Sequence, residues 1–149
     1  MTMKKALLST LAVAVLAGAS VFAAQKSEEP AIGGYCPVAY QAAKMAQKGD
    51  AKVTSTFEGQ TFYLTNAMVK QMFDKEPAKY APAYQGFCAA AVAKGMKLKS
   101  NPELFTVEGG KTYLFSTVEA KKMFDADKAN MIAMANGNWP KVAKMAVAK

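Results

Sequence analysis

A repeated segment is the feature that most limits how this chain can fold. Residues 57–64, FEGQTFYL, are matched 50 residues later by VEGGKTYL at 107–114. After one inserted residue, QMFD at 71–74 is matched by KMFD at 122–125, 51 residues later. In each copy the Glu-Gly pair indicates a turn between two short strands rich in Thr, Phe, Tyr and Val. The apolar spacing of residues 67–75 and 117–127 predicts a helix after each hairpin.

A single hairpin and helix cannot bury an apolar face alone. We therefore expect one small α+β domain over residues 31–142, in which duplicated β-hairpin–helix units near 53–80 and 104–130 pack together with flanking helices. Those flanking helices are predicted over 38–48, ended by Gly49, over 87–94, ended by Gly95, and over 140–148. Residues 143–149 are expected to form the end of the last helix. Between the units, residues 77–84 are expected to form an extended, packed connector.

The first 23 residues have the zones of a secretory signal peptide. Lys4 and Lys5 give a basic start, residues 6–18 are mostly apolar, and Val21 and Ala23 occupy the positions that a signal peptidase reads. The alternative is an uncleaved anchor, but this apolar stretch is shorter than the roughly 20 residues needed to span a bilayer. Cleavage after Ala23 would leave 126 residues with a net charge of +6. We expect a periplasmic or secreted protein without stable membrane insertion.

Two residue types are missing from the composition. The chain has no His, and all 19 basic residues are Lys. Without His there is no Ser-His-Asp or Cys-His catalytic pair and no imidazole metal ligand. Without Arg there is no bidentate clamp for phosphate or carboxylate. Because the lysines are scattered and form no stripe with aromatic residues, nucleic-acid binding is not expected, and neither is enzymatic activity.

The two cysteines, Cys36 and Cys88, have similar surroundings. Each follows a Gly-aromatic pair and lies at the start of a predicted helix, whose unpaired N–H groups would stabilise a thiolate. Together they could form a soft-metal site, because thiolate and thioether ligands select Cu(I). Two cysteines in an oxidising compartment also commonly form a disulfide, and a bridge closing 53 residues would add roughly 4 kcal/mol. The residues leave both interpretations open, and both can be states of one redox-sensitive site.

Eight methionines follow the signal segment. Met72 and Met123 occupy matching positions in the two predicted helices, so we expect them in the core. Met96 follows the glycine that ends the helix of Cys88, which makes it a candidate metal ligand. Met131 and Met134 are further candidates.

Several runs, in this order, resemble exported YHS-domain proteins: GGYCPVAY at 33–40, FDKEPAKYAPAYQGFCA at 73–89, GGKTYL at 109–114 and NWP at 138–140. The resemblance covers roughly residues 31–142. It implies a metal-binding domain, with copper as the expected metal. The His from which the family takes part of its name is absent, and many exported relatives carry Asp at the position of Cys36. The position of Cys88 matches the family better.

The leading hypothesis is an exported soft-metal carrier that binds copper through Cys36, Cys88 and Met96. Its partner would be the metal ion itself or a protein in the exported compartment. The alternative is a disulfide-stabilised interaction or small-ligand-binding protein without metal. Its groove between the two units would be lined by Tyr35, Tyr40, Tyr80 and Tyr84, unless these tyrosines are packed in the core.

Overall fold

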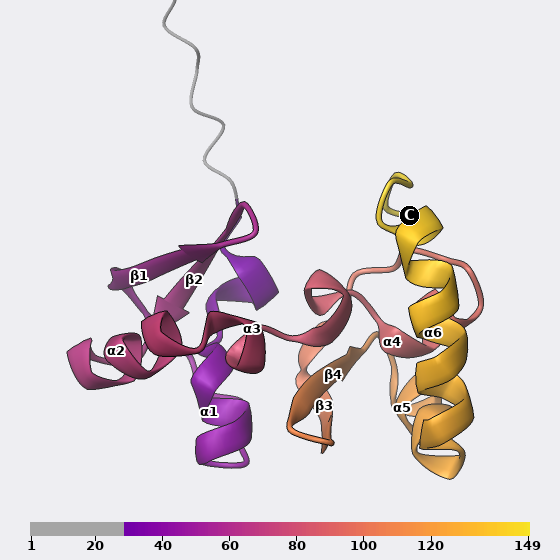
Figure 1. Ribbon diagram of the computed structural model, residues 1–149, viewed down its shortest axis with the longest axis horizontal. Helices are drawn as coiled ribbons and strands as arrows, with labels where there is room; N and C mark the ends of the chain where they lie inside the picture. Colours follow the sequence, from indigo (N-terminus) through magenta and orange to yellow (C-terminus); the bar gives the residue numbers. More distant parts are fainter. Residues whose placement is uncertain (1–28) are drawn as a thin grey trace, which may run out of the picture.

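The computed structural model describes residues 29–149 as a mixed α+β protein, which confirms the expected class (Figure 1). Two antiparallel two-stranded sheets lie in two lobes, which we define as the N-terminal lobe (residues 31–80) and the C-terminal lobe (residues 83–142). The predicted signal segment, residues 1–23, lies outside the described residues.

Both lobes contain the same order of elements. The N-terminal lobe consists of η1 (Ala31–Gly34), α1 (Pro37–Ala42), β1 (Asp50–Phe57), β2 (Gln60–Leu64), α2 (Ala67–Lys75) and α3 (Pro77–Tyr80). The C-terminal lobe consists of η2 (Ala83–Gly86), α4 (Ala89–Ala93), β3 (Asn101–Glu108), β4 (Lys111–Phe115), α5 (Val118–Ala126) and α6 (Lys128–Val142). The main difference is the last helix, which is short in the first lobe and long in the second.

The two hairpins correspond at a constant spacing of 51 residues. Strand β1 pairs with β2 from Asp50↔Leu64, and β3 pairs with β4 from Asn101↔Phe115, each with a register shift near the open end. The turns are formed by residues 58–59 and 109–110. The spacing of 50 read from the sequence was therefore wrong. The spacing of 50 aligns the two Glu-Gly pairs in the sequence. In the structure, however, only the first pair forms a turn: Glu108 is the last residue of β3, and the second turn is Gly-Gly.

One aspartate in each lobe fastens the helix to the hairpin. Asp74 on α2 accepts a hydrogen bond from the Ser55 hydroxyl of β1 and forms an ion pair with Lys70 at 2.7 Å. Asp125 on α5 accepts a hydrogen bond from the Thr106 hydroxyl of β3 at 2.7 Å. The aspartates that recur in the two sequence copies therefore hold each amphipathic helix across its own sheet.

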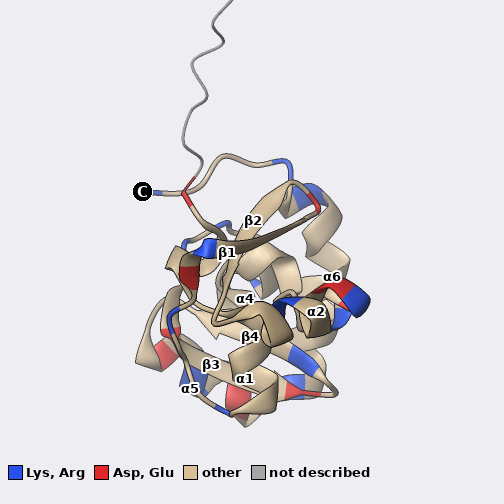
Figure 2. Ribbon diagram, turned by 90° about the vertical axis from the view of Figure 1, so that its left-hand side faces the viewer, with Lys and Arg blue, Asp and Glu red and all other residues tan. Residues whose placement is uncertain are grey.

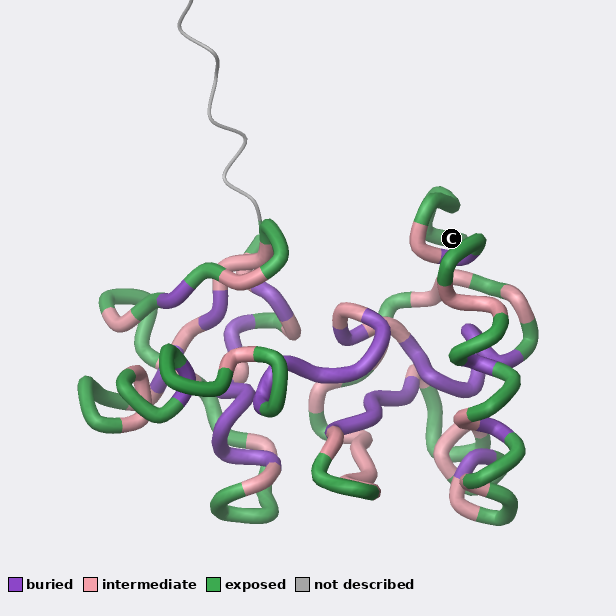
Figure 3. Tube along the Cα trace, in the orientation of Figure 1, coloured by how far each residue is buried: buried purple, intermediate pink, exposed green. Residues whose placement is uncertain are grey.

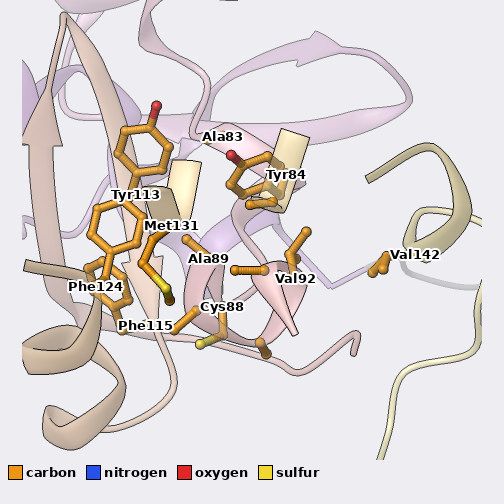
Figure 4. Packing of buried hydrophobic residues seen from close by; sticks show 14 residues of the cluster. Ala83, Tyr84, Cys88, Ala89, Val92, Tyr113, Phe115, Phe124, Met131 and Val142 are labelled. Carbon is orange, nitrogen blue, oxygen red and sulfur yellow. The ribbon is translucent and has the colours of Figure 1, made fainter. Parts of the chain in front are cut away.

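The apolar side chains form two separate clusters. In the N-terminal lobe, Phe62 of β2 packs on Phe73 of α2 with ring centroids 5.1 Å apart. In the C-terminal lobe, Tyr113 and Phe115 of β4 pack on Phe124 of α5 (Figure 4). Each lobe thus buries its own helix against its own sheet, as expected for a two-layer arrangement.

The first predicted flanking helix is shorter than expected. Helix α1 ends at Ala42, and Lys44, with φ of 56°, turns the chain away from it. Gly49 does not end a helix. It lies against β2, where a Cβ would come within 2.3 Å of the Tyr63 carbonyl oxygen. The second helix agrees better, because α4 ends at Ala93 and Gly95 adopts a φ of 79°.

The connector is packed as expected but is not extended. Residues 77–80 form α3 and residues 83–86 form η2, and Tyr80 and Tyr84 are buried where the chain crosses between the lobes (Figure 3). The C-terminal prediction was wrong: α6 contains Pro140 and ends at Val142 instead of continuing to residue 148. Helix α6 packs along α4, and beyond Val142 this apolar support is gone.

A tyrosine from the first lobe joins the two lobes. Tyr40 of α1 is fully buried, and its hydroxyl donates to the Pro102 carbonyl at 2.7 Å. Its ring meets Phe105 of β3 edge-on, with centroids 4.9 Å apart. Together with the buried connector, this contact makes the two lobes one packed body.

Candidate metal-binding cavity

The two cysteines occupy corresponding positions. Cys36 is the residue before α1 and Cys88 is the residue before α4. The Cys36 N–H donates to the Gln47 carbonyl at 2.7 Å, and the Cys88 N–H donates to the Leu98 carbonyl at 3.0 Å. Each cysteine is thereby fixed at the start of its helix, as the sequence predicted.

A left-handed turn precedes each cysteine. Residues 32–34 and 84–86 all have positive φ angles, which for Ile32 and Tyr84 are unusual backbone conformations. The two turns meet: a Cβ on Gly86 would lie 2.7 Å from Cγ2 of Ile32. Glycine is required at residue 86 because the other turn approaches it so closely.

The structure does not bring the two thiols together. Cys36 and Cys88 are both free and fully buried, and they belong to different apolar clusters. Cys36 lies in the N-terminal lobe, and Cys88 lies beside Phe115 and Met131 in the C-terminal lobe (Figure 4). The structure therefore contains neither a shared two-sulfur site nor a disulfide between these residues.

Cys88 and Met96, two of the three predicted ligands, line one cavity. This cavity of about 220 Å³ lies between α4 and α5, and Met123 of α5 also lines it. The rest of its wall is largely apolar, with Ala90, Ala91, Leu98 and Ala120. Three residues with soft sulfur donors thus face the same space.

Polar groups lie at one side of this cavity. The Ser116 hydroxyl donates a hydrogen bond to the Cys88 sulfur at 3.4 Å. Lys94 and Glu119 also line the cavity, and both are exposed at its mouth. One carboxylate and one ammonium group thus lie at the opening, and the Ser116 hydroxyl lies against the sulfur inside.

Cys36 has bulkier neighbours at the corresponding positions. Val38 is the counterpart of Ala90, and Val69 is the counterpart of Ala120; both valines pack into the cluster that contains Cys36. In the N-terminal lobe these valines are larger than the alanines that line the cavity at the same positions of the C-terminal lobe. Both thiols are fully buried, but Cys88 lines a cavity, whereas bulkier side chains pack around Cys36.

The methionines differ from the sequence expectation. Met72 and Met123 are 37% and 44% exposed, so placing them in the core was wrong. Met72 is at the surface of α2, and Met123 of α5 lines the Cys88 cavity, while the adjacent Phe73 and Phe124 fill the core. Of the further candidates, Met131 is buried in the C-terminal cluster and Met134 is exposed.

The four tyrosines form no common groove. Tyr40, Tyr80 and Tyr84 are buried, and Tyr84 donates its hydroxyl to Asn136 at 2.9 Å. Burial raises the pKa of Tyr40 and of Tyr84 above the ordinary value of 10.0. Tyr35 is partly exposed and donates to Glu103 at 3.2 Å. These rings serve packing and the contact between lobes.

Residues of both charges are scattered over the elements of the molecule (Figure 2). Within residues 29–149 no group of three or more Cys, Asp or Glu side chains is placed to hold a metal ion. None of the helices described for this stretch is long and apolar enough to cross a bilayer. The cavity of Cys88 is therefore distinguished by its sulfur atoms and not by carboxylates.

Sequence reasoning missed Met123, Ser116 and Glu119 as parts of this cavity. The available signal was the spacing of 51 residues, which relates Met45 to Met96 and Met72 to Met123. Because these methionines recur in pairs at one spacing, they indicate positions that are repeated in the two lobes and not residues that merely fill the core.

Comparison of the chain with protein-family models, curated proteins and solved structures gave no match.

Proposed function

We propose that this protein is an exported soft-metal-binding module of the YHS type, built from two copies of one unit, and that it carries Cu(I) in the cavity of Cys88. The observation that carries the proposal is the convergence of Cys88, Met96 and Met123 on a single cavity. Export is supported by the signal-like zones of residues 1–23, and the duplication by the shared spacing of 51 residues.

The donor set fits Cu(I) better than other common metals. One thiolate and two thioethers are the soft ligands that Cu(I) prefers. Zn(II) usually takes four N, S or O ligands, and Mg(II) and Ca(II) require oxygen ligands. The chain has no His, and Cys88 is the only cysteine in this cavity. A three-sulfur Cu(I) site is therefore the arrangement that these residues support.

The cavity also supports transfer of the ion. Met96 and Met123 are both exposed enough to contact solvent, whereas Cys88 is fully buried. We expect the thioethers to receive the ion at the mouth and the thiol to hold it inside. On binding, Cys88 gives up its proton to solvent and forms the sulfur–metal bond, and the Ser116 hydroxyl donates to the resulting thiolate.

The test is a titration of the reduced protein with Cu(I) in the presence of a competing chromophoric chelator. We expect Cys88→Ser to remove the most tightly bound equivalent of Cu(I), because the thiolate is the only anionic sulfur ligand in the cavity. Cys36→Ser, which changes the corresponding buried thiol of the other lobe, should retain that equivalent. Equal copper retention by the wild-type protein and by Cys88→Ser would refute the proposal.

A second variant removes space without removing a ligand. Ala120→Val introduces into the cavity wall the side chain that Val69 has in the N-terminal lobe. We expect it to weaken Cu(I) binding at least tenfold, with an unchanged circular dichroism spectrum. If Ala120→Val binds Cu(I) as tightly as the wild-type protein, the cavity is not the site.

A further inference from the structure

The positions that line the Cys88 cavity have counterparts in the N-terminal lobe. The counterparts of Met96, Glu119 and Met123 are Met45, Met68 and Met72, each 51 residues earlier. Where the C-terminal lobe has one thiol, two thioethers and a carboxylate, the N-terminal lobe has three thioethers at these surface positions. We propose that Met45, Met68 and Met72 form a second soft-metal site that binds Cu(I) or Ag(I) through thioethers alone.

The backbone places these three residues as it places their counterparts. Met45 follows a left-handed residue, Lys44, and its N–H points to the Ala39 carbonyl at 3.4 Å. Met96 follows left-handed Gly95, and its N–H donates to the Ala91 carbonyl at 2.9 Å. The segment from Ala39 to Met45 is one residue longer than that from Ala91 to Met96, but both methionines follow a left-handed residue and direct their N–H back to the preceding helix.

Helices α2 and α5 also correspond residue by residue. Each has nine residues and begins after a side-chain cap, in which Asn66 and Thr117 accept from the N–H three residues on. Met68 and Met72 are four residues apart on α2, so their side chains lie on one face of the helix. Because Met96, Glu119 and Met123 line one cavity, the equivalent backbone brings Met45 to the face of Met68 and Met72.

These methionines are not part of the apolar core. Met45, Met68 and Met72 are 51%, 73% and 37% exposed. Val38 and Val69 pack into the apolar cluster that contains the fully buried Cys36. In the proposed site the exposed thioethers turn toward one another and reach an ion from solvent without opening the lobe. Neutral thioethers are ligands of Cu(I) and Ag(I) in particular.

The second site does not use Cys88, so it is tested in a protein that lacks both thiols. The Cys36→Ser/Cys88→Ser double variant, labelled with ¹³C at its methionine methyl groups, is titrated with Ag(I), which is redox-inert. We expect the first equivalent to shift the methyl resonances of Met45, Met68 and Met72 together. Met134, which is similarly exposed but lies on α6 of the C-terminal lobe, should keep its position.

Replacement of two ligands gives the complementary result. In Met68→Leu/Met72→Leu, made in the thiol-free protein, the Met45 resonance should no longer respond to one equivalent, whereas Met134→Leu should leave the response intact. Uniform shifts of all exposed methionines, or no shift of these three, would overturn the second site. Failure of the Cys88 proposal is recognised separately, because it is measured by the loss of Cu(I) on Cys88→Ser in the protein that keeps its other thiol.

Discussion

Gly49 and Gly137 differ in the space around them, and this difference decides whether a larger side chain is tolerated. Gly49 touches the backbone of β2, where a Cβ would lie 2.3 Å from an oxygen that the strand pairing holds in place. Gly137 lies within α6, and a Cβ added there would have no heavy atom within 4 Å beyond its own helix backbone. The same substitution should therefore have opposite effects at the two positions.

Gly49→Ala should lower the free energy of unfolding by about 3 kcal/mol, because the added methyl group forces β2 away from the chain before β1. Gly137→Ala should raise it by about 0.5 to 1 kcal/mol, since alanine in a helix loses less conformational freedom than glycine. Urea unfolding followed by circular dichroism measures both. A stable Gly49→Ala protein would show that this close approach does not exist.

Helix α2 and helix α5 are each fastened to a hairpin through one carboxylate, and this makes both attachments sensitive to acid. Hydrogen bonds from Lys70 and Ser55 lower the pKa of Asp74 below its ordinary value of 3.8. Burial acts in the opposite direction on Asp125, but hydrogen bonds from Lys121 and Thr106 outweigh it and lower the pKa of that carboxyl as well. The folded state therefore binds these two protons less readily than the unfolded chain.

A lowered pKa in the folded state contributes stability above the unfolded value. That stability is lost as the pH falls below 3.8 and through the lower folded value. We expect Asp125→Asn to unfold at a lower temperature than the wild-type protein at pH 7, and the difference to shrink below about pH 3.8. Thermal unfolding at pH values of about 7, 4 and 2.5 measures this trend. A difference that stays constant over this range would contradict it.

The whole molecule depends on the contact between its lobes. Tyr40 reaches from the N-terminal lobe into the other through its hydrogen bond to Pro102 and its ring contact with Phe105. The only tryptophan, Trp139, packs against Tyr84 in the C-terminal lobe, with ring centroids 5.7 Å apart. Its fluorescence therefore reports on one lobe, while circular dichroism reports on both.

In the wild-type protein the two signals should follow one unfolding curve, because the lobes share a buried contact and a buried connector. Tyr40→Ala removes this contact, and we expect a loss of about 4 kcal/mol with unfolding curves that separate by probe. Tyr40→Phe, which retains the ring, should lose about 1 kcal/mol and keep the curves together. Coincident curves for Tyr40→Ala would mean that the lobes are coupled by other residues.

The sequence was sufficient to predict the α+β class, the two hairpins with their helices, and the positions of both cysteines at the starts of helices. These features depend on local patterns: alternating strands, glycine turns and apolar spacing. The end of α1, the left-handed Lys44 and the continuous helix through Pro140 depend on contacts between distant segments, such as α6 against α4. Local patterns contain no information about such contacts.

The candidate site could be predicted only in part for the same reason. Cys88 and Met96 are close in the sequence and were recognised together, whereas Met123 reaches the cavity from a helix that follows an entire hairpin. The separation of Cys36 from Cys88 also required the structure. Similar sequence surroundings indicated a common site, but each thiol is buried within its own lobe.

The outward placement of the methionines has a consequence for damage by peroxide. Of the eight methionines in residues 29–149, only Met131 belongs to a core cluster. Oxidants can reach the other thioethers without unfolding the protein, and a sulfoxide oxygen formed there meets water instead of an apolar interior. The fold should therefore survive an oxidation that takes up one lone pair of each sulfur and makes it a poorer ligand for the soft ion of the proposed site. Reduction of the sulfoxides would restore the side chains of an intact protein.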